Sequence, residues 1–251
     1  MLASLAFNMT DIVIPAEIDN DSPPARFDSF GLAPEILRAL SEQGYEHPTP
    51  IQEQAIPVVL QGRDVMGAAQ TGTGKTAGFS LPVIQLLMTH ANSSASPARH
   101  PVRALILTPT RELADQVADN VKAYLRYTNL RATVVFGGVD MAPQTTILRG
   151  GVEIVIATPG RLLDHVAQKS INLSQTQILI MDEADRMLDM GFIHDVRKVL
   201  KELPPVRQSL LFSATMPPDI EALAMTFLRS PVRVAVTPPS STADRIEQSV
   251  Y

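Results

Sequence analysis

Short apolar runs alternate with helix-length segments along most of this chain. The apolar runs favour strands because turn-forming or polar residues bound them; they cover residues 64–68, 102–107, 132–136, 152–156, 177–181, 209–212 and 232–236, the last as an edge strand. Helical patterns occupy residues 34–43, 77–91, 112–127, 141–148, 160–168, 192–203 and 219–227. This alternation predicts an α/β fold with a mostly parallel central sheet and helices on both faces. The near-continuous apolar strands agree, because such strands are buried on both sides.

Local signals refine the boundaries of these elements. Pro34 in a first turn and Gly44 after a last turn delimit the first helix. Pro82 is expected to disturb the helix over residues 77–91, because proline lacks the donor that a helix interior requires. Residues 92–101 are rich in serine, proline and alanine and predict a surface loop.

The chain divides into three parts. Residues 1–26 combine acids, prolines and short apolar pieces, and we interpret them as an N-terminal extension. Residues 27–236 carry the globular pattern and, within a chain of 251 residues, form one large domain. Residues 237–251 begin with a proline- and serine-rich stretch that is typical of a linker.

Composition narrows the possible functions. The chain has no cysteine, which excludes disulfides and thiolate metal sites and suits a reducing compartment. Its net charge is −5, so any binding of nucleic acid must come from a local patch. It has no apolar run of the ~18 residues that a membrane span needs. We therefore expect a cytoplasmic monomer without membrane contact.

The segment 69–76 has the character of a phosphate-binding loop. It lies between a predicted strand and a predicted helix, and Gly72 and Gly74 allow backbone N–H groups to turn toward an anion. Lys75 can reach β- and γ-phosphates, and the Thr76 hydroxyl can ligate Mg²⁺. Ala69 replaces the usual first glycine, and a flexible turn with a surface lysine is the simpler alternative. The nucleotide-binding candidates in the loop are Thr71, Gly72, Thr73, Gly74, Lys75 and Thr76.

A second acidic element follows the strand predicted at residues 177–181. Asp182 stands where P-loop enzymes hold Mg²⁺, directly or through water. Glu183 can accept a proton from an attacking water. A purely structural role, in which both acids cap the next helix, is compatible with this arrangement but does not explain their pairing with a phosphate loop.

Polar or glycine motifs follow nearly every predicted strand. Because ligands of open α/β sheets bind at the carboxyl ends of the strands, these motifs predict one functional edge. The motifs are residues 69–76, 108–112, 137–138, 158–161, 182–185 and 213–215.

Residues 44–52 precede the loop and contain a capping box. Thr49 is the N-cap, Pro50 the first helical residue, and Gln52 reaches back to the Thr49 N–H. Capping alone and recognition of a base both remain open for Gln52.

Taken in order, these motifs resemble those of the DEAD-box RNA helicases. The resemblance covers residue 27 to the C-terminus, and residues 44–52 look like the adenine-reading Q motif of that family. Alanine is the family's usual residue at position 69. Residues 77–82 and 189–192 are similar to the bacterial RhlE-like branch. The resemblance implies a three-layer α/β/α RecA-like domain over residues 27–236, followed by the start of an interdomain linker.

The resemblance also implies roles for individual residues. Lys75, Asp182 and Glu183 would be catalytic, with ATP or ADP and Mg²⁺ as ligands. Gln52 would bind adenine and Phe27 would stack on it, although Phe27 could equally be a core residue and Phe30 is a rival. RNA-backbone contacts are implied for Thr110, Arg111, Gly138, Thr158 and Arg161, which read phosphate and sugar rather than sequence. Coupling between the nucleotide and RNA is implied for Asp185, Ser213 and Thr215; turn capping is the alternative for Ser213 and Thr215.

The family has two RecA-like domains, and no second set of motifs follows in this chain. The second domain supplies arginine fingers, which are worth on the order of 10³–10⁵ in turnover in related enzymes. We therefore expect nucleotide binding, very slow hydrolysis, weak RNA affinity and no unwinding. The alternatives are a nucleotide-gated RNA-binding or regulatory module, or another P-loop NTPase; guanine-reading and transporter signatures are absent from the sequence.

Overall fold

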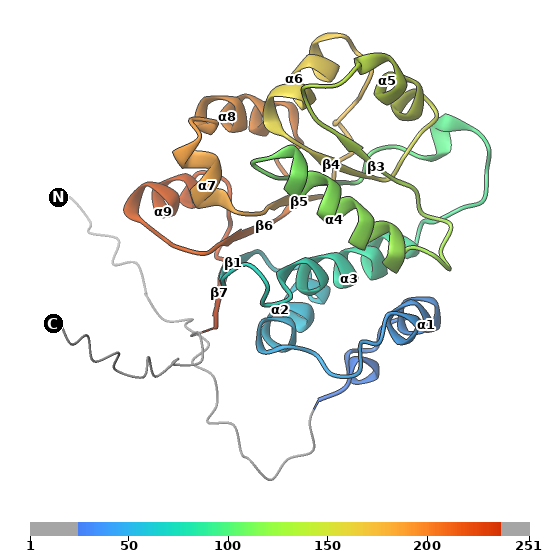
Figure 1. Ribbon diagram of the computed structural model, residues 1–251, viewed down its shortest axis with the longest axis vertical. Helices are drawn as coiled ribbons and strands as arrows, with labels where there is room; N and C mark the ends of the chain where they lie inside the picture. Colours follow the sequence, from blue (N-terminus) through green and yellow to red (C-terminus); the bar gives the residue numbers. More distant parts are fainter. Residues whose placement is uncertain (1–24, 237–251) are drawn as a thin grey trace, which may run out of the picture.

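The structure of the protein is a computed structural model that describes residues 25–236 (Figure 1). Residues 1–24 of the expected N-terminal extension and the whole expected linker, 237–251, lie outside the described residues. The strands are β1 (Val65–Ala68), β2 (Ala104–Leu107), β3 (Ala132–Val135), β4 (Ile154–Ala157), β5 (Ile178–Met181), β6 (Gln208–Ser213) and β7 (Val232–Ala235). Each of the predicted strands is confirmed, with boundaries that differ by a few residues.

Nine α-helices and two short 3₁₀ helices surround the sheet in the described residues. The α-helices are α1 (Pro34–Glu42), α2 (Pro50–Leu60), α3 (Lys75–Met88), α4 (Arg111–Tyr124), α5 (Met141–Arg149), α6 (Pro159–Ala167), α7 (Ala184–Asp189), α8 (Ile193–Glu202) and α9 (Pro218–Met225). The 3₁₀ helices are η1 (Phe27–Phe30) and η2 (Pro97–Arg99).

The sheet has the order β3-β4-β2-β5-β6-β1-β7, and all of its described strand pairs are parallel. The predicted α/β class is confirmed, and the sheet is fully rather than mostly parallel. β7 lies at an edge beside β1, as the sequence predicted.

Two apolar cores make the domain three-layered. Residues of α1 to α4 share one core with sheet residues such as Ile106 and Ile180. Residues of α5 to α9 share the other with Leu105 and Leu179. Because successive strand residues point to opposite faces, a continuous apolar strand supplies both cores. Because all the described strand pairs are parallel, the carboxyl ends of the strands lie at one edge of the sheet, and this edge carries the motifs.

One local expectation needs correction, and one helix had not been predicted. The disturbance expected at Pro82 is not found, because α3 continues through this residue to Met88. Pro82 is buried in the middle of α3, and α3 packs closely against α2, so tertiary packing compensates for the missing donor. The short helix α7 directly after Glu183 had not been predicted as an element.

A buried polar cluster fixes the loop over residues 92–101 beneath the opposite end of the sheet. His100 Nδ1 lies 2.5 Å from Glu153 Oε1, and both side chains are fully buried. His100 Nε2 lies 2.7 Å from the Ser94 carbonyl oxygen, and the Arg131 N–H donates to Glu153 Oε2 at 2.9 Å. The loop is thus tied to the residue that precedes β4.

None of the helices within residues 25–236 combines the length and apolarity that crossing a lipid bilayer requires.

Candidate functional site

The loop over residues 69–76 wraps around the N-terminus of α3. Gly72 and Gly74 have φ of +86° and +89°, a left-handed backbone that favours glycine. Lys75 is the first residue of α3, and its Nζ lies 3.8 Å from Asp182 Oδ1 at the end of β5. Both side chains are buried, and Lys75 Nζ has no hydrogen-bond partner among the described residues. A buried ammonium with free donors beside a helix N-terminus fits a phosphate group.

The electrostatics of Asp182 fit a metal ligand. Burial raises the pKa of its carboxyl to about 6; the nearby Lys75 opposes this effect and Glu183 adds to it. Asp182 Oδ1 accepts a hydrogen bond from the Glu183 N–H at 3.0 Å. An incoming cation would favour the ionised carboxylate that burial disfavours.

Glu183 is held in an unusual conformation. Its φ of +51° is left-handed, which is uncommon outside glycine and typical of functional sites. Thr71 Oγ1 donates to Glu183 Oε1 at 3.0 Å, and Arg186 Nη1 donates to Oε2 at 3.3 Å. The carboxylate is therefore oriented toward the phosphate loop by two partners. Arg186 was not singled out from the sequence, because its pairing depends on the unpredicted helix α7.

Gln52 serves two elements at once. Its Oε1 accepts the Thr49 N–H at 2.9 Å, so the glutamine half of the predicted capping box is formed. Its Nε2 donates to the Gly74 carbonyl at 3.0 Å, and Thr49 Oγ1 donates to the Thr73 carbonyl at 2.8 Å. The start of α2 is thus hydrogen-bonded to the phosphate loop, and the side chain of Gln52 is almost completely buried.

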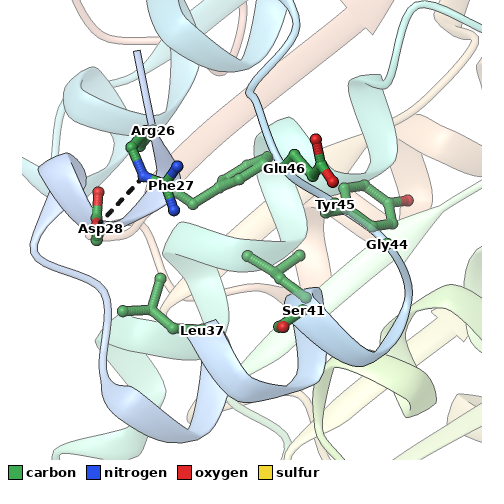
Figure 2. Close-up of a pocket in the computed structure, with 9 residues that line it drawn as sticks. Arg26, Phe27, Asp28, Leu37, Ser41, Gly44, Tyr45 and Glu46 are labelled. Atoms are coloured by element: carbon green, nitrogen blue, oxygen red, sulfur yellow. Dashed lines mark ion pairs between the residues drawn. The ribbon is translucent and has the colours of Figure 1, made fainter. Parts of the chain in front are cut away.

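A cavity of about 490 Å³ lies between η1, α1 and the segment after α1. Figure 2 shows the Phe27 and Tyr45 side chains on one side of it and Leu37 of α1 on another. Phe27 is 4% exposed and makes edge-on contacts with Phe30 and Tyr45, at centroid distances of 6.3 and 6.1 Å. Its ring is therefore both a core residue and part of a cavity wall.

A second cavity of about 200 Å³ is lined by residues of the phosphate loop and by Asp182 and Glu183. Tyr45 lines both cavities, and its hydroxyl lies 3.0 Å from that of Tyr124 in α4. Gln116 and Asn120 of α4 line the second cavity as well. Sequence reasoning missed these residues, although Gln116 and Asn120 are spaced to share a helix face with Tyr124.

The residues implied in RNA contacts come from the ends of β2, β3 and β4. Gly138 has φ of +81°, and a Cβ at this position would lie 3.6 Å from Arg111 Nη1. Arg161 Nη2 donates to the Val139 carbonyl at 3.0 Å, whereas its Nε and Nη1 are buried without hydrogen-bond partners among the described residues. Its Nε also lies 3.6 Å from Asp164. Arg111, Gly138 and Arg161 are thereby brought together.

The two threonines of this group occupy helix starts. Thr110 is the N-cap of α4, and its hydroxyl accepts the Leu113 N–H at 3.2 Å. Thr158 is the N-cap of α6 without a side-chain capping bond.

Asp185 connects α7 to the segment that follows β6. Thr215 donates to Asp185 Oδ2 from its N–H at 3.0 Å and its hydroxyl at 2.9 Å, and the Asp185 N–H donates to Ser213 Oγ at 3.1 Å. Burial raises the pKa of the Asp185 carboxyl, but the contacts with Ser213 and Thr215 outweigh it and the net pKa is lowered. Ionised Asp185 thus holds the 213–215 segment.

The strand order divides the functional edge into two halves. The neighbouring strands β5, β6 and β1 end in residues 182–185, 213–215 and 69–76. The neighbouring strands β3, β4 and β2 end in residues 137–138, 158–161 and 108–112. The half with the phosphate-loop residues and the half with the residues implied in RNA contacts are adjacent, and they meet between β2 and β5.

Comparison with known proteins agrees with this geometry. Residues 49–223 match the family model described as DEAD/DEAH box helicase. The chain is 41% identical over 239 residues to the DEAD-box ATP-dependent RNA helicase RhpA of Helicobacter pylori, covering 95% of this chain and 47% of that protein. It is 44% identical over 225 residues to the RNA helicase CrhR of Synechocystis, covering 90% of this chain and 44% of the relative.

A relative from a yeast has a similar identity to this chain. The chain is 44% identical over 230 residues to the ATP-dependent rRNA helicase rrp3 of Schizosaccharomyces pombe, covering 91% of this chain and 48% of that protein. The chain therefore spans about half the length of these curated relatives. Because they come from different bacterial groups and a yeast, they do not assign the chain to the RhlE-like branch, which stays a prediction.

Proposed function

The chain belongs to the DEAD/DEAH box helicase family, and from this premise we propose that it is the ATP-binding half of an RNA helicase. The observation that carries the proposal is the buried Lys75 ammonium, which lies 3.8 Å from Asp182 and has no hydrogen-bond partner among the described residues. Thr71 to Gly74 would surround the phosphates with backbone N–H groups, and Lys75 would bind the β- and γ-phosphates. Gln52 and Phe27 would contact adenine, with Phe27 in the wall of the larger cavity.

Thr76 and Asp182 would hold Mg²⁺, Asp182 directly or through water. When bound, the ion would supply positive charge that offsets the charge developing on the phosphates. Glu183 would accept the proton of the attacking water. The contacts of Thr71 and Arg186 with its two carboxylate oxygens support this role, because an oriented base lies near its target before reaction.

Arg111, Gly138 and Arg161, with Thr110 and Thr158, would bind the RNA backbone. The contact of Arg161 with the Val139 carbonyl and the exposed Gly138 backbone support phosphate and sugar contacts that carry no sequence preference. Asp185, Ser213 and Thr215 would couple the nucleotide site to RNA binding. Unwinding by a protein of the relatives' full length would also use a second RecA-like domain.

Nucleotide titration of the 251-residue chain tests the nucleotide site. Lys75→Ala is expected to weaken Mg²⁺–ADP binding by about 10-fold or more, since hydrogen bonds to charged groups contribute about 1.5–3 kcal/mol. Wild-type affinity in this variant would refute the proposal. Steady-state hydrolysis by the chain alone is expected to be very slow, and robust RNA-stimulated turnover would contradict that expectation.

The choice between an enzyme and a pure binding module needs the longer protein. There, Glu183→Gln is expected to remove turnover while ATP binding persists. A binding module would be unchanged in both measurements.

A further inference from the structure

A buried polar bridge lies behind the RNA-facing half of the edge. Gln144 of α5 donates from Nε2 to the Phe136 carbonyl at 3.1 Å. Its Oε1 lies 3.2 Å from His165 Nε2 in α6, and His165 Nδ1 lies 2.7 Å from Ser170 Oγ. His165 is fully buried and Gln144 is 8% exposed. None of these side chains has a part in the proposed nucleotide chemistry.

The protonation of the bridge follows from its partners. Burial is the main cause of the lowered pKa of His165, and the positive charge of Arg161 adds to it against the weaker effect of Asp164. His165 is therefore neutral at pH 7 and carries one ring proton. Because Gln144 uses its amide N–H on Phe136, its Oε1 needs a donor, and His165 Nε2–H supplies it. The Ser170 hydroxyl, whose oxygen lies 2.7 Å from Nδ1, donates to the His165 carbonyl at 3.1 Å.

The bridge connects two residues implied in RNA contacts. Phe136 directly precedes Gly137 and Gly138, so Gln144 fixes one end of that loop. At the other end, Arg161 Nη2 donates to the Val139 carbonyl. Arg161 and His165 are four residues apart and share a face of α6. α6 therefore holds the loop over residues 136–139 at both ends, once directly and once through Gln144.

We propose that Gln144 and His165 are positioning residues that hold the Gly137–Gly138 loop against Arg161 for contact with an RNA backbone. This inference rests on the proposed RNA site. Apolar side chains could fill the same space, but they would leave the Phe136 carbonyl without a donor and the loop free to shift. Binding sites require their first contacts to be held by such supporting hydrogen bonds, since small displacements weaken several contacts at once.

Paired variants separate positioning from general stability. His165→Gln places an amide near the Nε2 position and keeps a donor for Gln144, whereas His165→Asn keeps the Ser170 side and loses the bridge. Gln144→Met removes both bridge bonds at similar volume. Ser170→Ala is the matched control, because it damages the same buried cluster without touching the connection to Phe136.

The readout is binding of fluorescein-labelled single-stranded polyuridine RNA by the whole chain at low salt, with ADP affinity and the thermal midpoint measured in parallel. We expect His165→Asn and Gln144→Met to weaken RNA binding about 10-fold, the equivalent of ~1.4 kcal/mol. ADP affinity should be unchanged, and His165→Gln and Ser170→Ala should bind RNA nearly as well as the wild type.

Two results would overturn the proposal, and they are distinguishable. If Arg161→Ala weakens RNA binding but the bridge variants behave like Ser170→Ala at equal thermal midpoints, only the positioning role is wrong. If Arg161→Ala binds RNA like the wild type, the proposed RNA site is wrong and the positioning role falls with it.

Discussion

At the scale of single residues, burial opposes the negative charge of the Asp182 carboxyl and raises its pKa. Its carboxyl is almost fully buried, and Lys75 only partly offsets the cost of its charge. A folded-state pKa of about 6 lies above the ordinary value of 3.8. The folded protein therefore binds this proton more tightly than the unfolded chain does. Stability from this group is complete below the unfolded pKa and is lost as the pH rises through about 6.

Asp182→Asn should therefore stabilise the metal-free chain at neutral pH. At pH 3.5, below the ordinary value of 3.8, the wild-type carboxyl is largely protonated in both the folded and the unfolded state and resembles the amide, so the two proteins should unfold at similar temperatures. At pH 7.5 the variant should be more stable, with an upper limit of about 3 kcal/mol from a shift of roughly two pKa units. Thermal unfolding in chelator at both pH values measures this difference. A less stable variant at pH 7.5 would show that the ion pair with Lys75 outweighs burial.

The sequence predicts some site residues better than others, for a physical reason. Asp182 follows β5 directly and Lys75 ends the loop that follows β1, so a parallel sheet brings them to the same edge whatever the side-chain details. Tyr45 contributes through a contact across the fold with Tyr124, and Arg186 through a contact with Glu183 three residues away that requires helix α7. Such contacts depend on how α1, α4 and α7 pack, and a linear pattern does not contain that information.

At the scale of elements, the start of α2 is joined to the phosphate loop through Gln52. The two interpretations left open by the sequence are not exclusive, because one amide oxygen caps the helix while the amide nitrogen binds the loop. The amide nitrogen has a second N–H that these two bonds do not use.

Gln52→Glu should separate capping from nucleotide binding. A carboxylate keeps the acceptor for the Thr49 N–H but faces the Gly74 carbonyl with another acceptor and brings negative charge near the phosphates. We expect ADP affinity to fall about 10-fold or more, as for loss of a hydrogen bond with added repulsion. The thermal midpoint should stay above that of Gln52→Ala, which loses both bonds. Affinity losses that only follow stability in the two variants would support capping alone.

The loop over residues 92–101 provides a matched test far from the site. His100→Leu removes the partner of Glu153 and leaves a buried carboxylate, so we expect a loss of about 3–5 kcal/mol in the free energy of unfolding. Urea unfolding measures it. ADP affinity of the folded fraction should not change, because the cluster lies at the amino ends of β2 and β4. Glu153→Gln, which removes the buried carboxylate itself, should cost less; an equal or larger cost would contradict an explanation by buried charge.

Elements were predicted well where packing and local preference agree, and less well where they conflict. β2, β4 and β5 are buried along their whole length, so their sequence signal is continuous; the edge strands β3 and β7, which bury alternate residues, were found as well. Pro82 was expected to disturb α3, but burial against α2 and the sheet overrides the local cost. The short helix α7 was missed, because its start at the left-handed Glu183 has no usual N-cap signature.

At the scale of the whole molecule, one sheet carries both halves of the functional edge. In the sheet order, β2 and β5 are direct neighbours that pair along their length, so the two halves share a continuous hydrogen-bonded ladder. The Lys75–Asp182 pair and the cluster of Arg111, Gly138 and Arg161 are both formed in the same structure. Neither half needs the other to be assembled.

This arrangement predicts that nucleotide and RNA bind to the chain almost independently. A ligand shifts a second site only if it has different affinities for two states of the protein, and a single rigid sheet offers no second state. We expect saturating Mg²⁺–ADP to change the RNA dissociation constant less than about threefold, a coupling free energy below ~0.7 kcal/mol. Fluorescence anisotropy with labelled polyuridine measures it, and the reciprocal effect of RNA on ADP affinity must agree.

A coupling of tenfold or more would contradict this expectation and would identify a switch within the domain. Asp185 is the first candidate, since its bonds to Ser213 and Thr215 are the direct connection between α7 and the end of β6. Thr215→Val, which removes only the hydroxyl donor, would then reduce the coupling. If coupling is weak in this chain but strong in a protein of the relatives' length, the second state must come from a rearrangement between this domain and the rest of that protein.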